Sequence, residues 1–409
     1  NSNGFGCGGN RSGSSAYEVG SGTTIMGYAG ICGTDNIQPN SDPYFHAISF
    51  DQIGTYIDNG GSFCRGVINT GNNPPSITAM DNNNATIPFG TPFTLSGSAT
   101  DPDGDALTYS WEQWDLGPGG DWNDGANSTT QPLFKARVPK TTGQRTFPDM
   151  AVILAGYPVN PAATMGGLKG ETLPQVSRTM KFRLTVRDNR PNGGGVVSGG
   201  QGCQTGFTGT FQINVAPTGP FTVTVPNGGE SYPGGTLQNI TWNVAGTNAA
   251  PINTTDVKIS LSTDGGLTYP IVLAASTPND GSEMVALPTV LTSTARVKIE
   301  AIGNVYFDIS NANFSITAPV AGFDFDSPTP ATVACNGPTT ASITLGTSVI
   351  GTFSTPINLT ASGAPAGTTV TFGTNPVTPG NSTTVTLNGV NTLSAGSYNI
   401  TVTGTAGAV

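Results

Sequence analysis

The feature that most constrains this fold is a recurring alternation of apolar and polar residues in short runs. Clear examples are Phe93–Thr100, Leu107–Glu112 and Val257–Ser262, and turns rich in glycine, proline and asparagine separate such runs. Because successive side chains of a strand point to opposite faces, a period of two fits a strand with one buried face. The sequence therefore predicts a mostly β protein built from antiparallel β-sandwiches.

The composition fits this fold class and excludes two kinds of partner. Charged residues make up 10% of the chain, with 15 Lys plus Arg and 25 Asp plus Glu, whereas ordinary soluble domains have about 25%. A formal charge of −10 leaves no basic surface for nucleic acid. No apolar run reaches the roughly 18 residues that a membrane span needs. We expect a secreted or cell-surface protein that binds no nucleic acid and has no membrane span.

Turn-rich stretches divide the chain into four segments. We place them at residues 1–68, 73–217, 218–318 and 319–409, with the first boundary in the linker Asn69–Pro75. At roughly 100 to 200 residues per domain, the length is consistent with two to four domains.

The second segment has an acidic turn between two predicted strands. Asp101, Asp103 and Asp105 alternate in the sequence Ala99–Asp105. Calcium binds six to eight oxygen ligands, of which these carboxylates could supply three. The alternative is a solvated turn in which Pro and Gly set the geometry and Asp bonds its own backbone. The segment resembles immunoglobulin-like modules of the cadherin or polycystic-kidney-disease kind.

A long irregular stretch, Gln113–Lys181, interrupts the same segment and contains Trp114 and Trp122. Insertions of this length in a compact domain often carry function. Its aromatic side chains could line a sugar or peptide surface, or Trp111 and Trp114 could belong to the core beneath a covering loop. The sequence leaves both interpretations open.

The third and fourth segments repeat the strand pattern. The third is similar to fibronectin type III-like modules. Its stretch Ser262–Tyr269 fits the S-x-D-x-G-x-T-[W/Y] motif of sialidase hairpins, here called the sialidase-like box. In a sialidase propeller this motif would repeat once per blade, and here it does not recur. The motif therefore predicts a tight turn and does not imply glycosidase activity. The fourth segment, which we interpret as a truncated immunoglobulin-like sandwich, has five predicted strands, at Ser342–Leu345, Ile357–Ala361, Thr368–Phe372, Ser382–Leu387 and Ser397–Val402.

The first segment contains a glycine-rich stretch, Gly20–Gly33, with Met26 and Tyr28 near its centre. Together with Cys7–Arg11 and Asp42–Ser49, it resembles the reprolysin-like, adamalysin-type zinc metallopeptidases of the metzincin class. The resemblance covers about residues 1 to 68. It implies a truncated α/β remnant in which Met26 is the floor beneath the zinc-binding histidines. The Met-x-Tyr spacing, similar to that of astacin-like relatives, implies an oxyanion or zinc contact for Tyr28.

The zinc ligands of that family are absent from this sequence, which has a single histidine, His46, and no HExxH motif. A catalytic zinc needs three protein ligands and one open position. We expect His46 to pack near the start of a helix over Phe50–Ile57 rather than to bind metal. The resemblance implies a parent zinc peptidase that acts on protein or peptide substrates, with its ligands upstream. It also implies a chain truncated at both ends that is inactive alone.

The five cysteines are Cys7, Cys32, Cys64, Cys203 and Cys335. A bridge between Cys7 and Cys32 would close the glycine-rich loop, and Cys64 could pair outside this sequence, but spacing alone does not fix the connectivity. A catalytic Cys–His pair is the weaker interpretation, because an exported chain favours disulfides. A serine nucleophile lacks both a G-x-S-x-G elbow and a second histidine.

Two classes of function follow from the sequence. The first is a zinc metallopeptidase with β-sandwich accessory modules. The alternative is a non-catalytic adhesion or glycan-binding array that holds a cell-surface or extracellular matrix polymer. The methionine turn favours the peptidase, because an adhesin has no reason to carry one.

Overall fold

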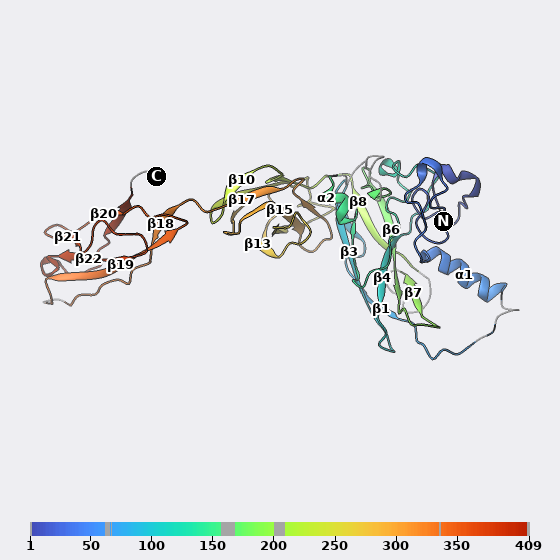
Figure 1. The fold of residues 1–409 in the computed structure, drawn as a ribbon, viewed down its shortest axis with the longest axis horizontal. Coiled ribbons are helices and arrows are strands. Elements are labelled where there is room, and N and C mark those ends of the chain that lie inside the picture. The colour runs from blue at the N-terminus through green and yellow to red at the C-terminus, as the bar shows by residue number, and fades with distance from the viewer. Residues whose placement is uncertain are drawn as a thin grey trace. The chain divides into compact units, whose positions relative to one another are not determined.

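The computed structural model describes residues 2–61, 66, 68–156, 168–199, 209–334 and 337–406. Strands dominate this part of the chain, as the alternating pattern predicts (Figure 1). None of its helices is long and apolar enough to cross a bilayer. The chain divides into two compact units. The first comprises Asn1–Ser231, Leu237–Ala286 and Thr292–Ser315, and the second Tyr232–Thr236, Leu287–Leu291 and Ile316–Val409.

Residues 2–61, here the N-terminal segment, are mostly loop with three helical pieces. These are η1 (Phe5–Asn10), η2 (Gly33–Asp35) and α1 (Ala47–Asn59). His46 precedes α1 in extended conformation, and its ring accepts a hydrogen bond from the Ile48 amide. Only the first turn of α1 is buried, so this end of the helix fixes it to the rest of the first unit.

The first sandwich spans residues 76–216 and has two sheets. Its strands are β1 (Ser76–Met80), β2 (Ala85–Pro88), β3 (Phe93–Thr100), β4 (Thr108–Gln113), β5 (Gln144–Phe147), β6 (Arg178–Arg187), β7 (Val196–Gly199) and β8 (Phe211–Ala216). One sheet has the order β1-β3-β5 and the other β2-β8-β6-β4, with β7 also paired to β6. All these pairs are antiparallel except β2 with β8.

Aromatic rings join the two sheets of the first sandwich. Phe93 and Phe147, from β3 and β5, stack with ring centroids 5.1 Å apart, and Phe147 lies 5.0 Å from Phe182 of β6. All three side chains are fully buried. Each buried aromatic removes a large apolar area from water, so this cluster is the centre of the core.

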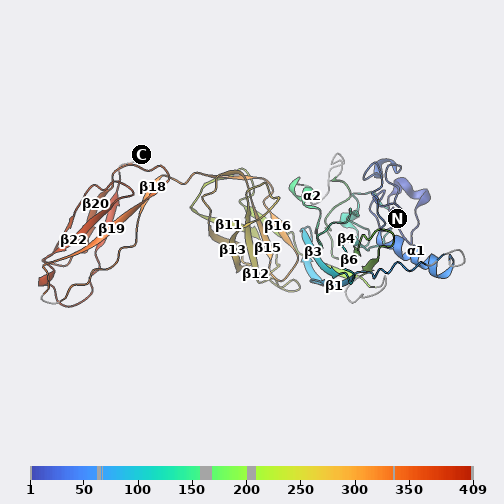
Figure 2. The same cartoon turned by 60° about the horizontal axis from the view of Figure 1, so that its bottom comes forward.

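The β4–β6 insertion, residues 114–177, runs between the two named strands and contains η4 (Gly125–Asn127), β5 and α2 (Met150–Leu154). Part of it, 157–167, lies outside the described residues. Ile153 of α2 packs against Phe307 and Ile309, which belong to the second sandwich. The insertion thereby connects the first sandwich to its neighbour within the first unit (Figure 2).

The second sandwich comprises β9 (Thr222–Val225), β10 (Ser231–Pro233), β11 (Leu237–Asn243), β12 (Asp256–Ser262), β13 (Ile271–Pro278), β14 (Ser282–Ala286), β15 (Thr292–Ala301), β16 (Phe307–Ile309) and β17 (Phe314–Thr317). One sheet has the order β10-β17-β15-β12-β13, with β16 beside β15, and the other has the order β14-β11-β9. Buried Trp242 of β11 and Ile259 of β12 lie on opposite sheets of its core.

The third sandwich lies in the second unit. Its strands are β18 (Gly322–Phe325), β19 (Thr340–Ile350), β20 (Asn358–Ser362), β21 (Thr369–Phe372), β22 (Ser382–Asn388) and β23 (Thr401–Thr405), with η6 (Val390–Thr392) before the last. Sheets β18-β19-β22-β21 and β20-β23 enclose a small core that includes Leu345, Leu359 and Val385. The predicted strand Ser397–Val402 is displaced, because residues 397–400 are irregular and pairing begins at Thr401.

A buried carboxylate, Glu171, holds the β4–β6 insertion together. It is 0% exposed and accepts hydrogen bonds from the guanidinium groups of Arg137 at 2.6 Å and Arg145 at 3.2 Å, and from the amide of Asp149. Arg145 also donates to the carbonyl of Lys135 at 2.6 Å. Glu171 therefore links the two sides of the insertion to the start of α2.

We expect Glu171→Gln to lower the stability of the first unit by about 3 kcal/mol, because it removes the ion-pair partner of the largely buried Arg145 and one of the two acidic partners of Arg137. The four tryptophans, Trp111, Trp114, Trp122 and Trp242, all lie in that unit, so their fluorescence during urea unfolding reports on it alone. Glu300→Gln is the matched control, since Glu300 is 31% exposed where it pairs with Lys298 and Lys258, and it should change stability by only about 1 kcal/mol. Equal effects of both substitutions would contradict this account.

Candidate functional site

The stretch that resembles a methionine turn folds as a tight turn. The Gly27 amide donates to the carbonyl of Thr24 at 2.9 Å, which leaves Ile25 and Met26 at the tip. Behind the tip, the buried carboxylate of Glu18 accepts hydrogen bonds from the amides of Thr23 at 2.8 Å and Thr24 at 3.0 Å. The loop is thus held from inside while its tip faces outward.

Met26 is 51% exposed, and Ile25 next to it is also exposed. The Tyr28 amide donates to the Ser21 carbonyl at 2.7 Å, and its hydroxyl donates to the Asn10 carbonyl at 3.3 Å. The Tyr28 hydroxyl is therefore bonded to the last residue of η1.

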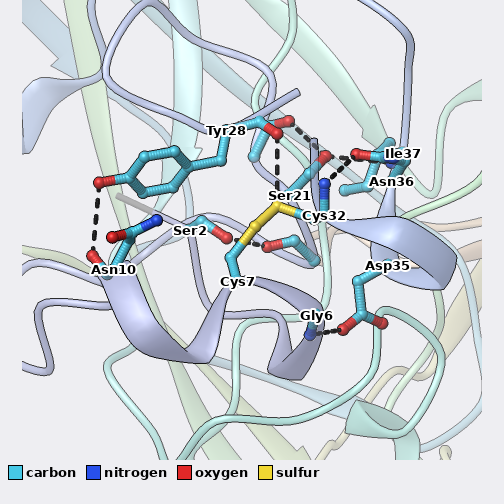
Figure 3. The surroundings of a disulfide bond; sticks show 12 residues. Ser2, Gly6, Cys7, Asn10, Ser21, Tyr28, Cys32, Asp35, Asn36 and Ile37 are labelled. Atoms are coloured by element: carbon cyan, nitrogen blue, oxygen red, sulfur yellow. Dashed lines mark hydrogen bonds between the residues drawn. A yellow bond between two sulfur atoms is a disulfide. The ribbon is translucent and has the colours of Figure 1, made fainter. Parts of the chain in front are cut away.

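A disulfide between Cys7 and Cys32 closes this region by joining η1 to the residue before η2 (Figure 3). Both cysteines are buried. The bridge shortens the free loop that carries the turn and so reduces the entropy lost on ordering it. The other three cysteines, Cys64, Cys203 and Cys335, lie outside the described residues, and so does any pairing of Cys64.

His46 is 1% exposed and its Nδ1 accepts from the Ile48 amide at 3.2 Å. Its ring lies parallel to that of Trp114, with centroids 6.0 Å apart. The residue is thus a helix cap packed among aromatic rings, as expected for a structural histidine.

The described residues do not fit a catalytic zinc. The chain's one histidine is committed to the helix cap. The one described group of three or more metal-ligating side chains consists of carboxylates in the first sandwich, whereas zinc favours nitrogen and sulfur ligands. None of its members lies in the N-terminal segment that carries Met26 and Tyr28.

The N-terminal segment is fastened to the first sandwich by buried polar contacts. The carboxylate of Glu112 on β4 accepts from the Ala47 amide at 3.0 Å, at the start of α1. Arg183 of β6 pairs with Asp51 of α1 at 2.8 Å, and its guanidinium carbon lies 3.6 Å from the centre of the Trp114 ring. A partly buried ion pair whose guanidinium also stacks on an aromatic ring fixes the position of α1.

The tryptophans of the β4–β6 region face inward. Trp111 is fully buried, Trp122 packs with Val19 and Ile37 of the N-terminal segment, and Trp114 stacks on Tyr17 at 4.3 Å. Of the two interpretations of the insertion, the covering loop matches the structure, since the tryptophans of its described residues pack against other segments.

The acidic turn of the first sandwich brings together a set of carboxylates that differs from the predicted one. Oxygens of Asp101, Asp105 and Asp188 all lie within 4.8 Å of one another. Asp103 is not a member, because its carboxylate accepts from the amide and side chain of Asn73, at 2.7 and 3.0 Å. Asp188, which directly follows β6, takes its place and was missed because it is remote in sequence.

Backbone hydrogen bonds shape this acidic cluster. Oδ1 of Asp101 accepts from the amides of Asp103 at 2.9 Å and Asp105 at 3.1 Å, which is the Asx-turn geometry of the alternative interpretation. The second oxygens of Asp101 and Asp105 are buried and have no hydrogen-bond partner. The cluster thus combines a self-bonded turn with two carboxylate oxygens still available to a ligand.

Asp188 and Arg190 set the electrostatics of the cluster. Burial raises the pKa of Asp188, but hydrogen bonds from Asn72, Arg190 and Gly195 outweigh it and the net pKa is lowered. The carboxylate therefore stays ionised at neutral pH. The guanidinium of Arg190 lies 3.7 Å from Asp105 and 3.2 Å from Asp103, and it neutralises part of the negative charge.

The sialidase-like box has a structural role. Oδ1 of Asp264 accepts from the amides of Leu267 and Thr268, both at 3.0 Å. Hydrogen bonds from Ser262 and Thr268 lower the pKa of Asp264. Gly266 has φ +95°, a conformation that glycine adopts without strain. The box makes a tight hairpin turn, as the sequence predicts.

Comparison with known proteins assigns no family. No protein-family model matches the chain, and no curated protein matches it. A solved structure described as the structural basis for Dscam isoform specificity aligns at 10% identity and TM-score 0.17, over 60% of this chain and 46% of that chain. Surface layer protein SbsC, domains 1–6, aligns at 13% identity and TM-score 0.16, over 81% of this chain and 53% of that chain. The alignments thus span about half of those chains, and such low TM-scores carry no argument.

The helix cap at His46 gives a paired test of how α1 is held. We expect His46→Ala to destabilise the first unit by about 1 kcal/mol more than His46→Asn, because asparagine keeps a side-chain acceptor for the Ile48 amide. Both variants lose the ring contacts, so their difference isolates the cap. Hydrogen exchange of the first-turn amides and urea unfolding followed by tryptophan fluorescence measure it. Indistinguishable variants would rule out the cap as the stabilising contact.

Proposed function

We propose that residues 2–61 are the Met-turn part of a reprolysin-like zinc metallopeptidase and that the sandwiches are its accessory modules. The immunoglobulin-like and fibronectin type III-like resemblances of those modules belong to the same proposal. The reaction of the whole protein is hydrolysis of peptide bonds in protein or peptide substrates. The observation that carries the proposal is the outward-facing turn with Met26 at its tip, on a loop closed by a disulfide.

Exposed apolar side chains in the N-terminal segment support this assignment. They are Phe5, Ile25, Met26 and Ile31, exposed by 63%, 44%, 51% and 70%. If these side chains share one face, that face has the apolar character of a surface that another part of a protein covers. In the proposed enzyme that part is the helix with the zinc-binding histidines, and Met26 lies beneath it.

The chemistry that zinc supplies in such enzymes is polarisation of the scissile carbonyl and activation of a water. The described residues cannot hold the ion, so this chain's own contribution is the apolar floor at Met26. Tyr28 keeps its proposed role as an oxyanion or zinc contact only if its hydroxyl leaves the Asn10 carbonyl.

An extracellular location is part of the proposal. The disulfide between Cys7 and Cys32 supports it, because such bridges persist in oxidising compartments. The rival function, adhesion or glycan binding to a cell-surface or matrix polymer, has less support. Trp111, Trp122 and Trp242 are buried, so none of these three rings can stack on a sugar.

We also propose that Asp101, Asp105 and Asp188 bind calcium. Two buried oxygens without a hydrogen-bond partner support this, and carboxylates are the hard ligands that calcium prefers. Binding requires Arg190 to give up its contact with Asp105. The site would then fasten the start of β4 to the end of β6 and contribute to the stability of the first sandwich.

The peptidase proposal predicts that this chain alone hydrolyses no peptide and retains no stoichiometric zinc. In the full-length protein, Met26→Glu should lower kcat/KM and zinc affinity by about tenfold or more, because it places a charge beneath the ion's ligands. Leu267→Glu, an equally polar change at an exposed apolar residue of the second sandwich, should leave both unchanged. Coding sequence before Asn1 without an HExxHxxGxxH motif, or equal behaviour of the two variants, would refute it.

The calcium proposal predicts that calcium chloride stabilises the first unit relative to EGTA. At a concentration about 100 times Kd the gain is about 2.7 kcal/mol. Asp105→Asn should reduce this gain, because it removes one ligand charge. Asp103→Asn is the control from the same turn and should keep it. Melting followed by tryptophan fluorescence measures the effect, and no difference between the variants would exclude the cluster as the site.

A further inference from the structure

The third sandwich carries almost no charge. Residues 316–409 contain two charged side chains, Asp324 and Asp326, and no lysine, arginine or glutamate. Asp324 belongs to β18, and Asp326 follows that strand and accepts a hydrogen bond from Ser348 at 2.6 Å. Sheets commonly carry charges on their edge strands, which block pairing with other chains. Here both charges lie at the β18 edge of one sheet, and the strands of the other sheet, β20 and β23, have none.

The sheet of β20 and β23 has one covered edge and one open edge. At the β20 edge, the side chain of Asn375 accepts from the Leu359 amide at 2.8 Å and donates to the Leu359 carbonyl at 2.9 Å. Ile357 also exchanges two backbone hydrogen bonds of 2.8 Å with Val377. In the described part of the chain, no strand other than β20 pairs with β23. The outer side of β23 is therefore an open sheet edge.

The contacts of Leu359 determine which backbone groups of β23 face outward. Its amide and its carbonyl both bond to Asn375, so they point away from β23. Leu359 and its partner Gly404 therefore form a non-hydrogen-bonded pair, in which the backbone groups of both residues point away from each other. The orientation recurs every second residue, so Val402 shares it. The open edge thus presents the N–H and C=O groups of Val402 and Gly404.

Two aromatic rings lie beneath this edge. A Cβ added at Gly404 would come within 2.9 Å of the Phe323 ring and 2.7 Å of the Phe325 ring. Both phenylalanines pack against the core of the third sandwich but are only partly buried. The inward-facing Leu184 and Ile259 of the other two sandwiches, by contrast, are 0% exposed. The core of the third sandwich is therefore incomplete next to the open edge.

We propose that the β23 edge binds the same edge of a second copy of this chain. In an antiparallel pair with Thr403 on the two-fold axis, Val402 of each copy lies opposite Gly404 of the other. Each such pair exchanges two hydrogen bonds, so all the outward groups of both edges are satisfied. An axis at Val402 or at Gly404 would instead pair one of these residues with residue 400 or 406, which lie outside the strand.

The side chains of the edge also fit a second copy. Val402 and Gly404 share the inner face of β23, because residues two apart on a strand point to the same side. Val402 of one copy therefore lies beside Gly404 of the other, over Phe323 and Phe325. On the outer face Thr403 meets Thr403, a favourable cross-strand pair, and no like charges come together. The joined sheet has the order β20-β23-β23-β20, and its formation does not depend on the peptidase proposal.

Sedimentation velocity of the whole chain tests the proposal and should show a concentration-dependent dimer. Thr403→Lys should raise the Kd of this dimer by about tenfold or more, because it places two like charges side by side at the axis. Thr371→Lys is the matched control and should leave Kd unchanged, since Thr371 is an exposed threonine of β21, the edge strand of the other sheet. A chain that stays monomeric at all concentrations, or equal weakening by both variants, would overturn the proposal.

A cysteine crosslink tests the register. The Cα atoms of a non-hydrogen-bonded antiparallel pair lie about 4.5 Å apart, a separation that a disulfide can span. Thr403→Cys should therefore oxidise to a covalent dimer on a non-reducing gel, whereas Thr371→Cys should not. The unsubstituted chain, which already contains Cys64, Cys203 and Cys335, gives the background. A crosslink at Thr371→Cys alone would place the contact at the β21 edge and contradict the proposal.

Discussion

The first unit depends most on the buried carboxylate of Glu171. A buried charge is tolerated only when partners satisfy it, and Glu171 has Arg137, Arg145 and the Asp149 amide. Arg145 extends the network to the carbonyl of Trp111 on β4, at 2.5 Å. An insertion too polar to form a core of its own is thereby ordered against the sandwich. Everything that packs on the insertion depends on this network.

Two parts of the first unit pack on the β4–β6 insertion. On one side lies the N-terminal segment, through Trp122 with Val19 and Ile37, and through Thr23, whose hydroxyl donates to the carbonyl of Ala136 at 2.9 Å. On the other lies the second sandwich, where Ile153 of α2 meets Phe307. The N-terminal segment buries little apolar area by itself, so the sandwich supplies most of its support. This explains how a loop-rich segment can hold an outward-facing turn.

The sequence predicted the strands well and the polar contacts poorly. The strand at Phe93–Thr100 has the predicted bounds because its alternation reports local burial directly. Helix α1 begins at Ala47, directly after the cap at His46, and the sequence places His46 near the start of a helix. The pairing of Glu171 with Arg145, and of Asp188 with Asp105 in one cluster, depends on how distant segments meet. No local pattern carries that information.

In this chain, buried charge marks the places where segments meet. Only 10% of the residues are charged, and the apolar cores of the sandwiches do not need them. Glu112 and Arg183 lie where α1 meets the first sandwich, and Asp188 lies where the linker crosses it, bonded to Asn72 at 2.7 Å. Apolar contacts are non-directional, whereas a carboxylate that must find particular donors permits one arrangement of two segments. The scarce charges thus fix how the segments of the first unit fit together.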